Sequence, residues 1–185
     1  MADSAVNHLR GDHQQARKFL AQLASLLDAL AQNRHWTAEH RESFRKLTVF
    51  FEHELCLLIR KEDEILYPAL RDLFPTDPGP LAVLRSEHRD LCRNFHKVCE
   101  IGRSFSDGDL ATSSLEEFQS CAREAVEVLE DHLYKEERVL FPMVAHYLLP
   151  QQDAELMQRM KSLQSSEKEP STFEPTPGNQ DSEGV

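Results

Sequence analysis

The chain has 185 residues, is 40% hydrophobic and 29% charged, and carries a formal net charge of −11, as expected of one soluble globular domain with a sizeable core. The negative charge excludes non-specific nucleic-acid binding, which needs an excess of Lys and Arg, and argues against docking on anionic membranes. No apolar run approaches the roughly 18 residues of a membrane-spanning helix, and polar residues interrupt the N-terminus where a signal peptide would be apolar. We therefore expect a cytoplasmic protein whose cysteines are reduced.

Two long helices are predicted in the first half of the chain. Residues 3–32 keep apolar side chains at a helical period. A short connection follows, and Thr37 is a suitable N-cap for a second helix over residues 38–73. Pro68 lies inside this helix and should bend its last turns or end it early.

Two further long helices are predicted in the second half. Pro80 suits the first turn of a helix that continues to about residue 103. Ser114 with Glu117 forms a capping-box pattern for a fourth helix, which runs to about residue 148. Pro142 should bend this helix as Pro68 bends the second.

The end of the chain has a different composition. Residues 151–163 are compatible with a short fifth helix, whereas residues 164–185 are rich in Ser, Pro, Glu, Gly and Thr. We predict a disordered acidic tail over residues 164–185. Residues 1–163 then form an all-α, up-down-up-down four-helix bundle, because short links make neighbouring helices antiparallel.

The bundle is an internal duplication. Residues 61–68 (KEDEILYP) align with residues 135–142 (KEERVLFP) at an offset of 74. Residues 9–13 (LRGDH) align with residues 84–88 (LRSEH) at an offset of 75. The repeating unit is therefore a helix pair, and each half offers a His early and an acid late.

The repeated His and Glu residues indicate a metal site. His132 and Glu136 are four residues apart and share one helix face. His and Glu side chains that point inward at one level are how helix bundles build metal centres, and imidazole nitrogen with carboxylate oxygen suits iron, manganese or zinc. Of each adjacent acid pair we choose the first. The predicted ligands are His13, Glu62, His88, His132 and Glu136.

One expected ligand is absent. The offset of 74 that relates the repeats places Leu58 where the second half has His132. Two Glu residues from different helices can each bridge two metals, so the ligand set favours a dinuclear centre. The metal on the side of position 58 then has a single His ligand, His13. We expect this metal to bind weakly or to leave a coordination position open. Glu54, one turn before Leu58, is a candidate replacement ligand or hydrogen-bond partner of one. The alternative is a carboxylate at the rim, paired with an Arg.

The remaining His, aromatic and Cys residues are assigned mainly to the surface or core. His8, like three other histidines, is predicted on the surface, and Tyr67 is predicted as a core aromatic. Cys92 lies one turn after His88 and is either a small apolar residue or a thiolate that reaches the metal. Cys99 and Cys121 should face each other between antiparallel helices, as packing residues or as a redox-sensitive pair.

Over about residues 5–149 the chain resembles the hemerythrin-like (HHE cation-binding) family. The resemblance rests on Asp12-His13, on Glu62 ahead of ILYP, on Glu87-His88, and on His132 with Glu136 ahead of LFP. It implies a four-helix bundle that holds a non-haem di-iron centre, two Fe per chain, with carboxylate bridges and His caps. The chain departs from the family at Leu58, where the family has its His. It also departs at Cys92, where oxygen-carrying members have another His.

Three functions remain open at this stage. The first is an iron protein that binds or processes a small ligand, namely O₂, nitric oxide or peroxide. The second is a binding module that senses iron or oxygen or stores iron. The third is a structural bundle with a degenerate site. The resemblance does not decide whether the protein is an enzyme, because one fold supports many functions.

Overall fold

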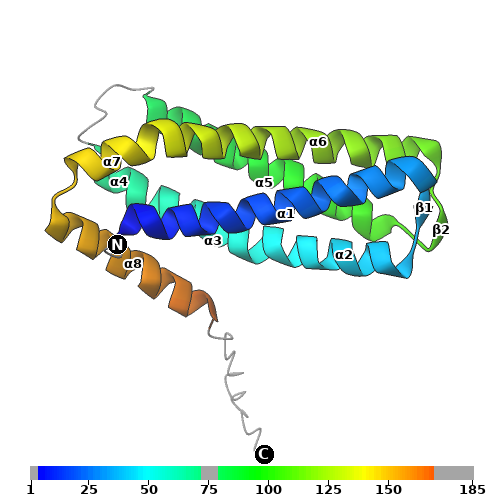
Figure 1. Ribbon diagram of the computed structural model, residues 1–185, viewed down its shortest axis with the longest axis horizontal. Coiled ribbons are helices and arrows are strands. Elements are labelled where there is room, and N and C mark those ends of the chain that lie inside the picture. Colours follow the sequence, from blue (N-terminus) through cyan, green and yellow to red (C-terminus); the bar gives the residue numbers. More distant parts are fainter. Residues whose placement is uncertain (1–3, 72–78, 169–185) are drawn as a thin grey trace, which may run out of the picture.

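Four antiparallel helical columns lie side by side in the computed structural model, which describes residues 4–71 and 79–168 (Figure 1). The elements in chain order are α1 (Ala5–Asn33), β1 (His35–Trp36), α2 (Ala38–Val49), η1 (Phe50–Leu55), α3 (Cys56–Arg60), η2 (Lys61–Leu66), α4 (Tyr67–Ala69), α5 (Pro80–Ser104), β2 (Gly108–Asp109), α6 (Thr112–Lys135), η4 (Glu136–Leu140), α7 (Phe141–Tyr147) and α8 (Pro150–Lys168). The first and third columns are the single helices α1 and α5. The second and fourth columns are interrupted by the π-helical turns η1, η2 and η4. The all-α bundle fold is confirmed.

Helix starts are set partly by side-chain caps and partly by a strand pair. The Thr37 hydroxyl accepts a hydrogen bond of 3.2 Å from the His40 N–H, so the predicted cap of α2 is confirmed. The capping box predicted from Ser114 and Glu117 was wrong, because α6 already begins at Thr112. The start is earlier because the Leu115 N–H already donates a hydrogen bond of 3.0 Å to the Ala111 carbonyl.

A two-stranded ribbon closes one end of the bundle, where we expected plain connections. His35 pairs with Asp109, and Trp36 pairs with Gly108, in antiparallel register. Trp36 is buried, with its ring edge-on to those of Phe44, Phe105 and Phe118. Aromatic packing therefore holds this end of the bundle together, at the opposite end from α8 (Figure 1).

The two repeated prolines each follow a π-helical turn. In η2 the Tyr67 N–H donates to the Glu62 carbonyl, five residues back. Pro68 has no N–H to donate next, so the carbonyls of Asp63 and Glu64 lose helical partners. Two arginine side chains replace these partners. Arg85 donates a hydrogen bond of 3.1 Å to the Asp63 carbonyl, and Arg159 donates one of 3.3 Å to the Glu64 carbonyl. The turn that carries Glu62 is thus held by α5 and α8.

The fifth helix is longer than predicted. Helix α8 runs from Pro150 to Lys168, so the tail predicted over residues 164–185 was wrong for its first five residues. Gln164 accepts a hydrogen bond of 3.2 Å from the Lys61 ammonium, and Glu167 pairs with Arg60. These polar residues resemble a solvated tail in composition, yet they order because they contact the bundle. Residues 169–185, and Leu73 at the predicted end of the second helix, lie outside the described residues.

Among the described residues, no helix is both long and apolar enough to cross a membrane. All four cysteines are free thiols. Cys99 is buried, and Cys121 packs against the apolar core. The expectation that Cys99 and Cys121 face each other stays a prediction.

Candidate metal centre

The five predicted side chains meet inside the bundle. They come from all four columns: His13 from α1, Glu62 from η2, His88 from α5, His132 from α6 and Glu136 from η4. None is more than 2% exposed. Burial of so many ionisable groups is unfavourable unless each finds a partner or an ion. Their shared position therefore marks a built polar site within an apolar core.

Four donor atoms form the tightest part of this site. His88 Nε2 lies 2.9 Å from His132 Nε2 and 3.2 Å from Glu62 Oε2. His132 Nε2 lies 3.5 Å from Glu136 Oε2. One atom from each of these four residues lies within 4.8 Å of the other three. Two imidazole nitrogens and two carboxylate oxygens thus surround one point.

His13 lies beside this group of four rather than in it. Its Nε2 is 3.3 Å from Glu62 Oε1 and 3.2 Å from Glu136 Oε2. Glu62 therefore presents one oxygen to His13 and the other to His88. This is the arrangement expected of a carboxylate that spans two positions.

Each imidazole has a second acid at its outer nitrogen. Nδ1 of His13, His88 and His132 lies 3.1, 3.2 and 3.0 Å from Glu137, Asp63 and Glu87, respectively. Each outer acid also pairs with a cation, namely Arg17, Arg85 and Lys135. An acid at Nδ1 fixes the ring and turns Nε2 toward a metal. The outer acids are sequence neighbours of the predicted ligands, so the choice of the first acid in each pair agrees with the geometry.

Tyr67 takes part in the site, which sequence analysis missed. Its hydroxyl donates a 2.6 Å hydrogen bond to Glu136 Oε1. Its ring stacks on His88 with an interplanar angle of 8°. The equivalent aromatic of the other half, Phe141, packs on His13 but has no hydroxyl. The difference between Tyr and Phe at these aligned positions was the only signal in the sequence.

The charges of the site are strongly coupled. Burial alone would lower the pKa of His13, but its contacts with the Glu136 and Glu62 carboxylates outweigh burial and raise the pKa to about 10. The pKa of His88 is also raised to about 10, because contacts with Asp63 and Glu62 outweigh burial. Burial opposes ionisation of Glu136, yet His13 and His132 hold its pKa well below its usual range. Without a metal, the inner carboxylates therefore retain protons on His13 and His88.

The donor set fits a metal cation. Glu136 Oε2 is buried and accepts no well-aligned hydrogen bond from the described residues. The facing Nε2 atoms of His88 and His132 are only 2.9 Å apart, so they cannot both carry a proton there. A cation between these nitrogens and the carboxylate oxygens would satisfy all of them. Nitrogen and oxygen donors of this kind suit iron, manganese or zinc.

The other candidate ligands do not join the site. Glu54 is exposed, because the inward face of its column is occupied at this level by Leu55 and Leu58, and an acid beside them stays in water. Cys92 is also exposed. Leu58 is 4% exposed, so the prediction that it is buried is confirmed.

A buried lysine lies three residues after Leu58. Lys61 is 1% exposed. Its ammonium donates to Asp12 over 2.8 Å and lies 3.1 Å from His8 Nε2, in addition to its bond with Gln164. His8 is therefore half-buried and not simply a surface residue. Sequence analysis missed Lys61 because a Lys in a charged run normally faces water.

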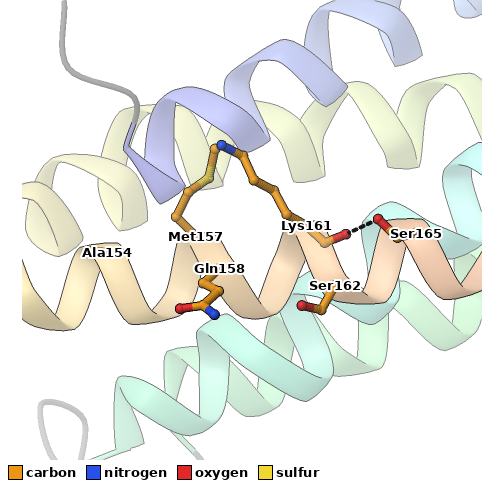
Figure 2. A pocket seen from close by; sticks show the side chains of 6 residues that line it. All are labelled: Ala154, Met157, Gln158, Lys161, Ser162 and Ser165. Atoms are coloured by element: carbon orange, nitrogen blue, oxygen red, sulfur yellow. Dashed lines mark hydrogen bonds between the residues drawn. The ribbon is translucent and has the colours of Figure 1, made fainter.

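A surface hollow of about 670 Å³ lies away from this centre, along α8. Figure 2 shows that the side chains lining it come from this single helix. The Ser165 hydroxyl donates a hydrogen bond of 2.9 Å to the Lys161 carbonyl within the same helix. With no His or acid in its lining, the hollow offers no comparable chemistry.

The chain matches one protein family over most of its length. The hemerythrin HHE cation-binding domain matches residues 4–144 and again residues 79–174. The two matches begin 75 residues apart, in agreement with the offset between the aligned His13 and His88 motifs. A search of curated proteins found no match. The protein belongs to the hemerythrin HHE cation-binding domain family.

Proposed function

We propose that the protein binds non-haem iron at the buried centre and presents it to a small ligand, namely O₂, nitric oxide or peroxide. The observation that carries this proposal is the group of four buried donor atoms from Glu62, His88, His132 and Glu136, all within 4.8 Å of one another. The family match supports a cation site. Iron is preferred over manganese or zinc through the resemblance to hemerythrin-like proteins.

The protein's residues prepare the site in three ways. The outer acids Asp63 and Glu87 orient two imidazoles. Tyr67 holds one oxygen of Glu136. Phe141 packs on the His13 ring, and the buried Leu58 adds apolar bulk to the second column. When bound, iron would supply the reversible ligand binding or redox chemistry.

Metal analysis tests this function. Protein purified without added metal, then titrated anaerobically with ferrous iron and desalted, should retain iron. His88→Ala should lose the iron, whereas His146→Ala, at an exposed site in α7, should keep it. If the wild-type chain retains no metal after this treatment, the proposal is wrong and the structural bundle with a degenerate site is favoured. Mixing the loaded protein with nitric oxide, O₂ or peroxide would then identify the ligand.

Iron sensing is a second candidate, favoured by the contacts of α8. This helix holds the turn of Glu62 through Gln164 on Lys61 and Arg159 on the Glu64 carbonyl. Occupancy of Glu62 would therefore stabilise the docking of α8. Hydrogen exchange should then show greater protection of α8 in loaded than in metal-free protein. Equal protection in both forms would argue against sensing and leave small-ligand chemistry.

A further inference from the structure

We propose that the protein holds one tightly bound metal ion, in the position formed by Glu62, His88, His132 and Glu136, and that the His13 side takes no second ion. This inference rests on the proposed iron function and concerns the number of ions. It departs from the two Fe per chain expected from the family resemblance. Three differences between the halves of the duplicated chain carry it.

The first difference is in the ligands. The tight position has four protein donor atoms close together. Among the described residues, the opposite position has three candidate donors: His13 Nε2, Glu62 Oε1 and Glu136 Oε2. Two of these belong to carboxylates that the tight position already uses. Leu58 fills the place where a second His would stand, with a side chain that is 4% exposed and cannot ligate.

The second difference is in the outer acids. In the second half, Glu87 Oε2 lies 3.0 Å from His132 Nδ1 while Glu87 Oε1 pairs with Lys135 at 2.5 Å. The aligned acid of the first half is Asp12, which pairs with Lys61 at 2.8 Å. No imidazole is available at position 58 to take the role of His132. The Asp12–Lys61 pair thus repeats the Glu87–Lys135 pair, but the first half has Leu58 in place of His132.

The third difference is in the aromatic residues. Tyr67 donates to Glu136 Oε1, so only Oε2 of Glu136 faces the centre. Phe141 cannot do this for Glu62, which directs both oxygens at imidazoles. The hydroxyl of Tyr67 therefore removes one of the oxygens that a second ion would use. With Leu58, it leaves the His13 side short of donors.

His13 has a different part to play in a one-ion site. Its Nε2 lies between oxygens of the two carboxylates, and its Nδ1 faces Glu137. A ring in this position orients Glu62 through a hydrogen bond and Glu136 through its charge. We therefore describe His13 as a positioning residue, not a ligand.

Ferrous iron is the probe for the test. Wild-type protein, loaded anaerobically with excess ferrous iron, desalted and oxidised, should contain one iron per chain. It should give the EPR signal of a lone high-spin ferric ion, whereas a coupled diferric pair is EPR-silent. His13→Gln should keep one iron, because the four ligands remain. Two irons per wild-type chain, or loss of the iron in His13→Gln, would overturn the inference.

Leu58→His tests the same idea in the opposite direction. The new imidazole should pair with Asp12 as His132 pairs with Glu87. The iron content should then rise from one to two per chain. Adding Asp12→Asn should weaken the second ion by about 10- to 100-fold. Leu58→Met is the size-matched control and should stay at one. If Leu58→His binds only one iron although circular dichroism shows it folded, the inference is wrong.

The results separate the inference from the proposed function. A chain that binds no iron defeats the proposed function itself. A chain that binds two irons supports the function and defeats only the one-ion site. If Leu58→His does not fold, the iron counts of wild type and His13→Gln still decide.

Discussion

The Tyr67 hydroxyl donates a 2.6 Å hydrogen bond to Glu136 Oε1, joining an aromatic of the first half to a carboxylate of the second. Both residues are almost completely buried. The bond therefore forms where water cannot replace it, and an unpaired carboxylate oxygen there would be unfavourable. It crosses the bundle between the two π-helical columns and fixes the orientation of a candidate ligand.

Tyr67→Phe should lower the free energy of unfolding of the metal-free protein by about 1.5–3 kcal/mol, the usual value of a hydrogen bond to a charged group. The ring itself should still pack, because Phe occupies the aligned position 141. Urea denaturation of both proteins measures the difference. Tyr134→Phe is the control, since this side chain is 62% exposed and its loss of a hydroxyl should change little.

Glu87→Gln should weaken iron binding by about 10- to 100-fold, because the outer acid sets the orientation and basicity of His132. Competition with a chelator of known affinity measures the change. Glu100→Gln on the same helix is the control, because this side chain is 65% exposed and pairs only with His96 among the described contacts. Equal affinities for the two variants would mean that Glu87 does not support a ligand.

The metal-free protein should lose stability as the pH rises from about 6.5 to about 10. The pKa values of His13 and His88 are raised from 6.5 to about 10 in the folded chain. Their charged forms therefore stabilise the fold fully below the unfolded value, and this contribution is lost as the pH passes through the folded value. The pKa of Glu136 is lowered, so its contribution is lost on the acid side, below about 4.5. Urea midpoints measured with chelator present at several pH values test this.

Iron affinity should change with pH in the opposite sense. A metal binds the neutral imidazole and displaces its proton, so affinity should increase as the pH rises through the same alkaline range. Titrations at fixed pH in a weakly buffered solution should also show proton release on binding. Binding that is independent of pH would mean that the metal does not displace a proton from His88.

Gly102→Ala should destabilise the fold by about 1–3 kcal/mol, because extra bulk in a packed core forces neighbours apart. A Cβ at this position would lie 2.3 Å from the Phe44 ring, which is held by Trp36 and Phe118. Gly11→Ala is the matched control within α1, since a Cβ there meets nothing within 4 Å. Because Ala has a higher helix propensity than Gly, Gly11→Ala should stabilise the fold by up to about 1 kcal/mol. Thermal unfolding of both variants should shift in opposite directions.

Sequence alone predicted the bundle, the duplication and the inward position of all five candidate ligands. It succeeded with Glu62 and Glu136 because a fixed helical spacing relates each acid to position 58 or 132. The outer acids could not be predicted in the same way. Whether Asp63 meets His88 depends on how α5 lies against η2, which no spacing within one helix determines.

Tertiary contacts also decide two further positions, one that the sequence did not indicate and one that it assigned wrongly. Lys61 has the sequence context of a solvated residue, yet α8 covers it and Gln164 accepts its hydrogen bond. Glu54 was a candidate replacement ligand, but a position on the flank of the apolar face lets its charged side chain remain in water. The apolar pattern of one helix identifies its buried face, and the neighbouring helices determine how far that face extends.

The duplication also has an evolutionary consequence. Two separate helix pairs that associate as a symmetric dimer must carry every substitution twice. A Leu at position 58 would then appear in both copies and remove the His at that position from both halves. Once the two pairs share one polypeptide, each can mutate alone, and the pairs Leu58/His132 and Tyr67/Phe141 record that freedom. A duplication within one chain thus allows the two halves to differ at the same aligned position, which two identical subunits cannot do.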